Sequence, residues 1–284
     1  FFRLRMAKGQ EALAVGLVGT ALLLCIRLRS RRNAAHAPSE EGKVVALRRY
    51  AVKGLWHDEL DHVKLVAGES FPSDRRWAFL RGDTNTEEFE PQAPQWLHKS
   101  NFHCAFNAGE LVAQLRTAYN DDTHTLTVKD LSGRITVSGS LSDAGGRTHL
   151  QNFFRGHFND PQLRLVNAEN HDSHQFNNTT AGKKVIHLLN LATLREVSQA
   201  MNKELDPLRF RANILFDCIT PWSEFNWVGH NIKVGTATLK VIRRTVRCNA
   251  TNINISNCEF DLDFPAALEK HYPKHGPYLG IYSE

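Results

Sequence analysis

The sequence predicts a mixed α+β protein that is rich in β-strands. A single transmembrane helix is predicted to precede this β-rich part of the chain. Short stretches that alternate apolar and polar residues recur between Gly-, Pro- and Asn-containing turns, a pattern typical of a small β-barrel or sandwich. Fewer stretches have the periodicity of a helix. Close to the N-terminus, an uncharged run over residues 12–26 is followed at once by a cluster of arginines.

Composition sets the broad class of the protein. A chain of 284 residues with ordinary apolar and charged fractions can hold one large domain or two modest ones. Its five cysteines are odd in number and too sparse for a disulfide scaffold, which favours a reducing compartment. The net charge of +5 comes from basic residues near the N-terminus, so we expect no nucleic-acid partner.

The uncharged run Ala12–Ile26 predicts a membrane anchor over residues 1–32, with a basic flank at its C-terminal end. Fifteen helical residues reach roughly 22 Å, whereas the hydrocarbon core is roughly 30 Å thick. A span of this length needs Lys8, Glu11 and Arg27 to snorkel or the bilayer to thin. A signal-peptide core and a remnant of a targeting presequence are the alternatives. The polar residues 33–42 have no apolar periodicity and predict a linker.

The remaining residues predict short strands with a few helices between them. The strand-like stretches of the first half are 43–52, 63–66, 77–80 and the hairpin 125–129 and 134–141 around Ser132-Gly133. Helical stretches are 108–119 and 151–158. Farther along, Thr193-Leu-Arg-Glu196 matches a capping box and predicts a helix that presents Leu194, Val197 and Met201 on one face. Apolar alternation returns at 208–217 and at 229–242.

The alternating run that ends near Ile242 feeds a loop that contains Arg247 and Cys248, so we expect Cys248 at the end of a strand. A guanidinium next to a cysteine favours the thiolate, because the positive charge lowers the cost of deprotonating sulfur. Cys248 is therefore a candidate nucleophile or soft metal ligand. A buried and chemically inert cysteine is the alternative.

Four motifs follow one another in order: Tyr50-Ala-Val-Lys53-Gly54, Asp74-Arg75-Arg76-Trp77, Arg211-Ala-Asn213-Ile214, and Arg247-Cys248 with Ala250-Thr251-Asn252. Together they resemble the MOSC (molybdenum cofactor sulfurase C-terminal) superfamily, whose corresponding patterns are Y-P-V-K-[SG], D-R-x-[WF], R-P-N-[IL] and R-C-x-x-T. The resemblance implies a MOSC β-barrel domain over residues 166–284 and an accessory N-terminal β-barrel-like domain over residues 43–165. An anchor before such a body resembles the mitochondrial amidoxime-reducing members and implies a single-pass mitochondrial membrane protein; the body itself resembles bacterial members.

The same resemblance implies a molybdenum cofactor, molybdopterin, and assigns roles to residues of the four motifs. Cys248 would ligate molybdenum, which suits a soft thiolate. Lys53, Arg75, Arg211 and Arg247 would hold the phosphate or the pterin of the cofactor, because Arg binds oxyanions bidentately and Lys acts as a point charge. Asn213 and Thr251 would donate hydrogen bonds to the pterin or to oxo ligands.

Departures from the family patterns lie at and after these motifs. Ala51 and Ala212 replace prolines, and Thr251 is followed by Asn252-Ile-Asn-Ile-Ser-Asn-Cys258 where the family commonly has D-P or N-P and then Thr-Gly. The family also usually continues beyond the position of Glu284 with a further strand, so we expect either further chain or a partner protein that covers the sheet edge.

Two functions are compatible with this sequence. The first is a membrane-anchored molybdenum oxidoreductase that reduces N-hydroxylated compounds with electrons from a separate redox protein, because the chain has no flavin, haem or iron–sulfur motif of its own. The second is a cofactor-free MOSC scaffold that serves as an accessory subunit of a mitochondrial inner-membrane complex, an interpretation favoured by the altered residues after Thr251. Molybdenum analysis of the purified chain separates these two functions.

Overall fold

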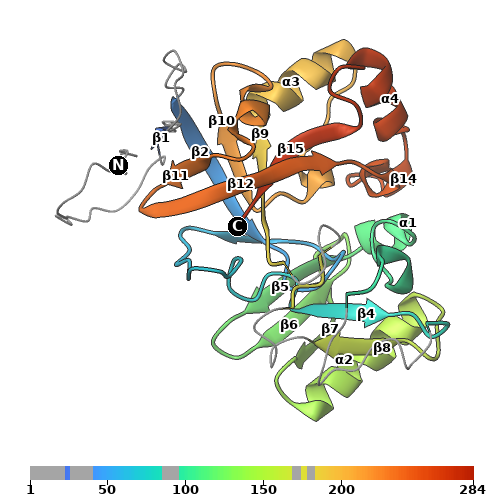
Figure 1. Ribbon diagram of the computed structural model, residues 1–284. Coiled ribbons are helices and arrows are strands. Elements are labelled where there is room, and N and C mark those ends of the chain that lie inside the picture. The colour runs from blue at the N-terminus through green and yellow to red at the C-terminus, as the bar shows by residue number, and fades with distance from the viewer. Residues whose placement is uncertain (1–22, 26–40, 85–95, 168–173, 178–182) are drawn as a thin grey trace.

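The computed structural model describes residues 23–25, 41–84, 96–167, 174–177 and 183–284. These residues form a mixed α+β structure in which two groups of elements lie against each other (Figure 1). One group is a large curled sheet with helices α3 and α4 beside it, and the other contains two small sheets and helix α2.

The group of small sheets is built mostly from the first half of the chain. Strands β5, β6 and β7 form a three-stranded antiparallel sheet, and β4 pairs antiparallel with β8. The elements of this group are β4 (Trp77–Leu80), η2 (Lys99–Asn101), α1 (Gly109–Ala113), β5 (Arg116–Asn120), β6 (Thr125–Lys129), β7 (Ile135–Ser140), α2 (Ala144–His157) and β8 (Arg164–Asn167). Helix α2 begins where the carboxylate of Asp143 accepts a hydrogen bond from the Gly146 amide, an ordinary N-cap.

The large sheet has the strand order β1-β2-β10-β9-β15-β12-β11, and β3 pairs with β2 beside this path. Its strands are β1 (Leu23–Cys25), β2 (Glu41–Arg49), β3 (Asp58–Leu60), β9 (Ile186–Asn190), β10 (Ile214–Asp217), β11 (Asn231–Val234), β12 (Ala237–Val246) and β15 (Tyr278–Ser283). The connecting elements are α3 (Leu191–Ala200), η3 (Pro207–Phe210), η4 (Ser223–Trp227), η5 (Asn249–Thr251), the hairpin β13 (Ile253–Asn254) and β14 (Glu259–Phe260), and α4 (Phe264–His271). Strand β2 thus joins a sheet whose other long strands come from residues after 185.

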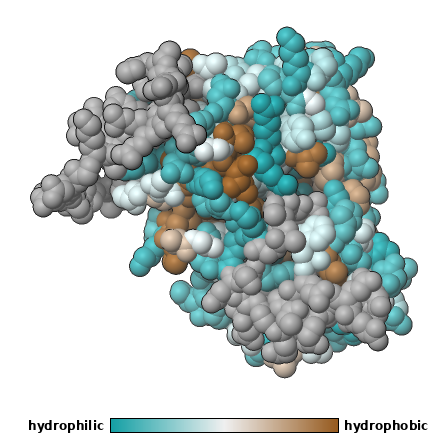
Figure 2. Space-filling view, viewed as in Figure 1, coloured by the Kyte–Doolittle hydropathy of each residue, from teal (hydrophilic) through white to brown (hydrophobic). Residues whose placement is uncertain are grey.

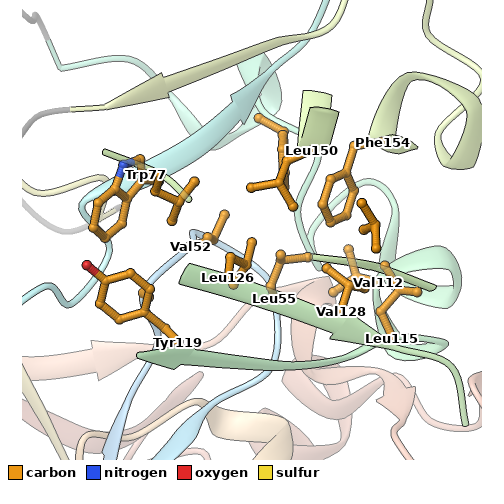
Figure 3. Close-up of a cluster of buried hydrophobic side chains, with 14 of the residues drawn as sticks. Val52, Leu55, Trp77, Val112, Leu115, Tyr119, Leu126, Val128, Leu150 and Phe154 are labelled. Atoms are coloured by element: carbon orange, nitrogen blue, oxygen red, sulfur yellow. The ribbon is translucent and has the colours of Figure 1, made fainter. Parts of the chain in front are cut away.

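Each group has its own apolar core. In the group of small sheets, side chains from α2 and the three-stranded sheet enclose Trp77, and Figure 3 shows Leu150 and Phe154 facing Leu126 and Val128. The large sheet buries Phe216, Trp227, Ile232 and Val241 on one face, while Leu194 and Phe264 pack with Leu215 in a third cluster. On the face in view, Figure 2 shows hydrophobic patches among mostly hydrophilic residues.

The prediction of a transmembrane helix is wrong for the residues that can be checked. Leu23, Leu24 and Cys25 belonged to the predicted helix, but they form strand β1, which pairs antiparallel with Lys43, Gly42 and Glu41 of β2. A continuous apolar run has no periodicity that distinguishes a helix from a buried strand, which explains the error. No helix in the described residues has both the length and the apolar character needed to span a bilayer. Residues 1–22 and 26–40, and with them most of the predicted anchor and linker, lie outside the described residues.

The prediction of a β-barrel domain with an accessory barrel-like domain is also wrong. The large sheet is a curled half-barrel, because its hydrogen-bonded path ends at β1 on one side and at β11 on the other. In the other group the three-stranded sheet and the β4–β8 pair are separate, and the apolar side chains of β6 and β7 share one core with side chains of α2 and β4. A helix can bury the apolar face of a sheet without closing its hydrogen-bond ladder.

Local predictions had mixed outcomes. The strand at 77–80 and the hairpin around Ser132-Gly133 are confirmed. The predicted helix 108–119 is instead the short α1 followed by β5, and 63–66 contains no strand. Helix α3 begins at Leu191 with Asn190 as its N-cap, so Thr193 is not the cap; its hydroxyl donates to the buried carboxylate of Glu224.

One buried carboxylate ties both groups together. Asp74 is fully buried, and its oxygens accept hydrogen bonds from the Tyr50 amide at 2.8 Å, Asn213 Nδ2 at 3.0 Å and Gln175 Nε2 at 2.9 Å. The guanidinium of Arg75 completes the set. Residues from four separate segments therefore depend on one side chain.

Replacing Asp74 with Asn should lower the free energy of unfolding by about 3–5 kcal/mol, because it removes one partner of a buried ion pair and turns an amide NH₂ toward other donors. Denaturant unfolding with comparison of midpoints and slopes measures the loss. Asp83→Asn is the matched control, since Asp83 pairs with Arg81 at the surface and should change stability by less than about 1 kcal/mol. Equal effects of the two substitutions would contradict the role of Asp74.

Candidate functional site

A pocket of about 160 Å³ lies where the two groups of elements meet. All seven residues assigned to the cofactor by the sequence motifs line it, although they come from distant parts of the chain. They are Lys53, Arg75, Arg211, Asn213, Arg247, Cys248 and Thr251.

Cys248 lies two residues beyond the end of β12 and is half-buried at the pocket. It occupies the N-cap position of η5, where its carbonyl oxygen accepts hydrogen bonds from the Thr251 amide at 2.9 Å and from Thr251 Oγ1 at 2.8 Å. The one hydroxyl donor of Thr251 is therefore used to hold the loop, and its lone pairs remain as acceptors. The predicted position of Cys248 after a strand is confirmed, and Thr251 fixes the backbone that carries its sulfur.

Arg247 is buried, and in the described residues it pairs with no carboxylate. Its guanidinium donates to the carbonyl of Leu279 and to His187 Nε2, the latter at 2.7 Å, and lies 3.4 Å from the Phe210 carbonyl oxygen. Burial lowers the pKa of Arg247 to about 10, and the charges of Tyr282 and Cys248 act in the opposite direction. A guanidinium held only by neutral acceptors leaves its charge available to an anion in the pocket.

His187 must be neutral to make this contact. Arg can only donate, so Nε2 of His187 accepts and its proton resides on Nδ1, 3.4 Å from the carbonyl oxygen of Arg211. Burial and the nearby charges of Arg247 and Arg75 lower the pKa of His187 well below its usual value, which is consistent with this tautomer. The imidazole therefore orients Arg247 without adding charge.

Lys53 is buried and lines the same pocket. Its ammonium donates to the Phe176 carbonyl at 3.1 Å and lies 5.4 Å from the centre of the Phe102 ring. Burial lowers the pKa of Lys53 to about 8, and the charges of Cys104 and Cys248 act against this decrease. Both cysteines are thus within electrostatic reach of the same ammonium.

Arg211 and Arg75 meet between the two groups of elements. Arg211 adopts a left-handed backbone conformation after η3, and its Nη2 donates to the Gly54 carbonyl at 2.6 Å. Its Nε is buried and has no hydrogen-bond partner among the described residues, a costly arrangement that a ligand would relieve. Arg75 donates to the Arg211 carbonyl at 3.0 Å and is paired with Asp74.

Asn213 serves the chain itself. Its amide group donates to Arg48 O at 3.1 Å and to Asp74, and its oxygen accepts from the amide of His187 at 3.1 Å. With these contacts the side chain positions the strands and Arg75, and its two donor hydrogens are already engaged.

The pocket has an uncompensated positive charge. Seven cationic side chains line it, and the described lining contains no Asp or Glu. Carboxylates outside the lining neutralise two of the cations, through the pairs Arg75–Asp74 and Arg209–Asp261. Lys53, Arg211 and Arg247 have only neutral hydrogen-bond acceptors in the described chain.

Sequence motifs did not reveal several residues of this pocket. His187, Lys99, Arg243 and Cys104 all line it but belong to none of the four motifs. The basic residues are scattered along the chain from position 53 to 247, so no local cluster of charge marked them. A basic residue facing the interior of an alternating strand, as at Arg243 in β12, is the one local signal that could have been used.

Gly280 allows β15 to approach the His187–Arg247 pair. A Cβ at this position would lie 2.6 Å from Leu188 O and 2.9 Å from His187 Nε2, and the glycine has φ of +79°. Gly280→Ala should therefore destabilise the fold by more than the roughly 1–2 kcal/mol that a left-handed backbone alone costs. Gly133→Ala is the matched control, since its φ is +85° and nothing lies within 4 Å of the added atom. Equal losses in denaturant unfolding would show that close approach at Gly280 contributes nothing.

A family model matches the part of the chain that carries much of this pocket. Residues 155–284 match the model of the MOSC domain family, a family associated with the molybdenum cofactor. A comparison with curated proteins found none that matches the chain. The match covers β9, β10, β12, η5 and β15. Of the pocket residues, His187 lies in β9 and Tyr282 in β15, Arg211 lies between η3 and β10, and Arg247 and Cys248 lie between β12 and η5. This match shows a MOSC domain over residues 155–284 of the chain.

Proposed function

We propose that the protein binds a molybdenum cofactor and reduces N-hydroxylated compounds with electrons from a separate redox protein. The observation that carries this proposal is the pocket itself, which a half-buried cysteine lines together with Lys53, Arg211 and Arg247, three cations that no carboxylate of the described chain neutralises. A ligand that carries negative charge and a metal ion suits this pocket, because the charge pairs with the cations and the metal accepts the cysteine sulfur as a ligand. The pterin phosphate and the metal of a molybdenum cofactor combine these properties.

The residues present fit such a group. Arg211 Nε is a buried donor that lacks a partner in the described chain, and Arg247 and Lys53 are buried cations whose described hydrogen-bond partners are neutral. Buried charges and donors of this kind are costly unless an anion neutralises them. Lys53, Arg211 and Arg247 would hold the phosphate and pterin, and the Cys248 thiolate would ligate the metal.

The bound metal would supply two-electron chemistry for breaking an N–O bond. The net reaction consumes two electrons and two protons, releases water, and leaves the N–H compound. Within the chain, Thr251 fixes the backbone at Cys248, and His187 keeps Arg247 oriented as a neutral acceptor. Asp74 and Asn213 keep Arg75 in place at the same pocket. In this proposal a separate redox protein supplies the electrons.

Cys248→Ala should abolish reduction of an N-hydroxylated substrate and remove most of the bound molybdenum, because a methyl group cannot ligate the metal. Metal content by mass spectrometry and activity with an artificial electron donor measure the two effects. Cys258→Ser is the control, since Cys258 is buried away from this pocket and should retain both. An active, molybdenum-replete Cys248→Ala protein would refute the proposal. A folded wild-type chain that binds no cofactor would instead indicate a cofactor-free MOSC scaffold.

Anion binding in the pocket should weaken as pH rises above about 8. Burial lowers the pKa of Lys53 to about 8, so the free protein loses the ammonium charge above that value. A bound anion stabilises the ammonium of Lys53 and therefore raises its pKa. At a pH between the pKa of the free protein and the pKa of the complex, binding of the anion is accompanied by uptake of a proton. Sulfate is a suitable probe because its charge is constant here. Its affinity should fall by at most about tenfold per pH unit between pH 8 and 10.

Calorimetric titrations with sulfate at several pH values measure this dependence. In Lys53→Met the decrease above pH 8 should flatten, whereas the exposed Lys64→Met should behave as wild type. A steep decrease that persists in Lys53→Met would assign the titration to another group.

A further inference from the structure

Two cationic side chains of the pocket lie outside the motifs that we assign to the cofactor. Lys99 comes from η2 and Arg243 from β12, and both are half-exposed rather than buried. Lys99 Nζ lies 4.0 Å from the centre of the Phe106 ring, and the Arg243 guanidinium lies 5.9 Å from the centre of the Tyr282 ring. Each cation therefore lies near an aromatic ring that also lines the pocket.

Apolar surface accompanies these cations. Phe106 is half-buried, and Val246, the last residue of β12, is 55% exposed. Both line the same pocket as Lys99, Arg243 and Cys248. An exposed valine and an aromatic ring that line the same pocket are suited to contact a planar apolar ligand.

The charge of the pocket also decides which ligands it disfavours. Because the described lining contains seven cations and no carboxylate, a protonated amine or amidinium entering it meets only like charge. Selectivity is a difference in affinity, so this repulsion matters as much as the attraction for an anion. Lys53, Arg211 and Arg247 are more suited to the cofactor, which leaves Lys99 and Arg243 for the substrate.

We propose that Lys99 and Arg243 select anionic substrates, namely N-hydroxylated aromatic compounds that carry a carboxylate. Phe106 and Val246 contact the ring, and the two cations bind the carboxylate. This inference rests on the proposed function for its reaction, whereas its recognition step depends only on the pocket.

Binding of three small probes of similar shape tests the recognition step without any turnover. Benzoate, benzamide and benzamidine carry a negative, no and a positive charge, and each is titrated into the full chain by calorimetry or by ligand-observed NMR. The expected order of affinity is benzoate, then benzamide, then benzamidine. Benzamidine binding as tightly as benzoate would overturn the proposal.

Variants show which cations are responsible. Lys99→Gln and Arg243→Gln should each weaken benzoate binding by about three- to fivefold and leave benzamide binding unchanged, as expected for half-exposed ion pairs. Lys240→Gln is the matched control, because Lys240 lies on the same strand β12 but outside the pocket. Benzoate binding that is insensitive to both pocket variants would assign the anion to the inner cations and overturn the proposal.

Turnover of a substrate pair tests the consequence for the reaction. In the cofactor-loaded protein, 4-carboxy-N-hydroxybenzamide should be reduced with a higher kcat/KM than N-hydroxybenzamide, and the ratio should fall by about three- to fivefold in each pocket variant. Each reduction breaks the N–O bond with two electrons from the donor and two protons, giving the amide and water. A ratio of one in the loaded wild type overturns this inference while the proposed function stands. Conversely, a chain that orders the three probes as expected but holds no molybdenum refutes the proposed function and supports the charge selectivity.

Discussion

The buried carboxylate of Asp74 is the constraint on which the site depends. It accepts hydrogen bonds from the backbone of Tyr50 and from the side chains of Gln175 and Asn213, and it neutralises Arg75. A fully buried carboxylate is stable only when its lone pairs are used in this way. Because its partners come from segments on both sides of the pocket, satisfying Asp74 also determines where Arg75, Asn213 and the residues after Tyr50 lie.

The other cations of the pocket differ from Arg75, because no carboxylate of the described chain neutralises three of them. Lys53, Arg211 and Arg247 are held by carbonyl groups and by neutral His187, and the described chain provides no carboxylate for them. Burial lowers the pKa of both Lys53 and Arg247, which indicates that their charged forms are stabilised less than in water. A protein gains stability from binding an anion at such a place, since ligand binding to the folded state adds to the free energy of unfolding. Neutral His187 leaves the positive charge of Arg247 uncompensated, whereas a carboxylate at the same position would neutralise it.

Prediction from the sequence succeeded where a pattern is local and failed where the choice depends on distant pairing. The hairpin β6–β7 and strand β4 follow from alternation and turn residues within a few positions. The continuous apolar run that includes Leu23–Cys25 has no such periodicity, and pairing with β2 made its described residues a strand. Residues 116–119 likewise became part of β5 instead of continuing α1, since they pair with β6. In the same way, a sheet closes into a barrel only when its first and last strands pair. In the described sheet β1 and β11 are the unpaired ends of the path, and no local sequence pattern predicts this.

By itself, the sequence determined strand β4, the hairpin β6–β7, the position of Cys248 after a strand, and the order of the four motifs. These are properties of neighbouring residues and of their order. Only the tertiary structure decided that Lys99, Cys104, His187 and Arg243 join them, and that the cations face no carboxylate in the described lining. Contacts between segments separated by more than a hundred residues, such as Arg75 with Arg211 and Lys53 with Phe176, arise from packing the two groups of elements together. The charge of the pocket is therefore a property of that packing, because the same residues spread along an extended chain form no basic cluster.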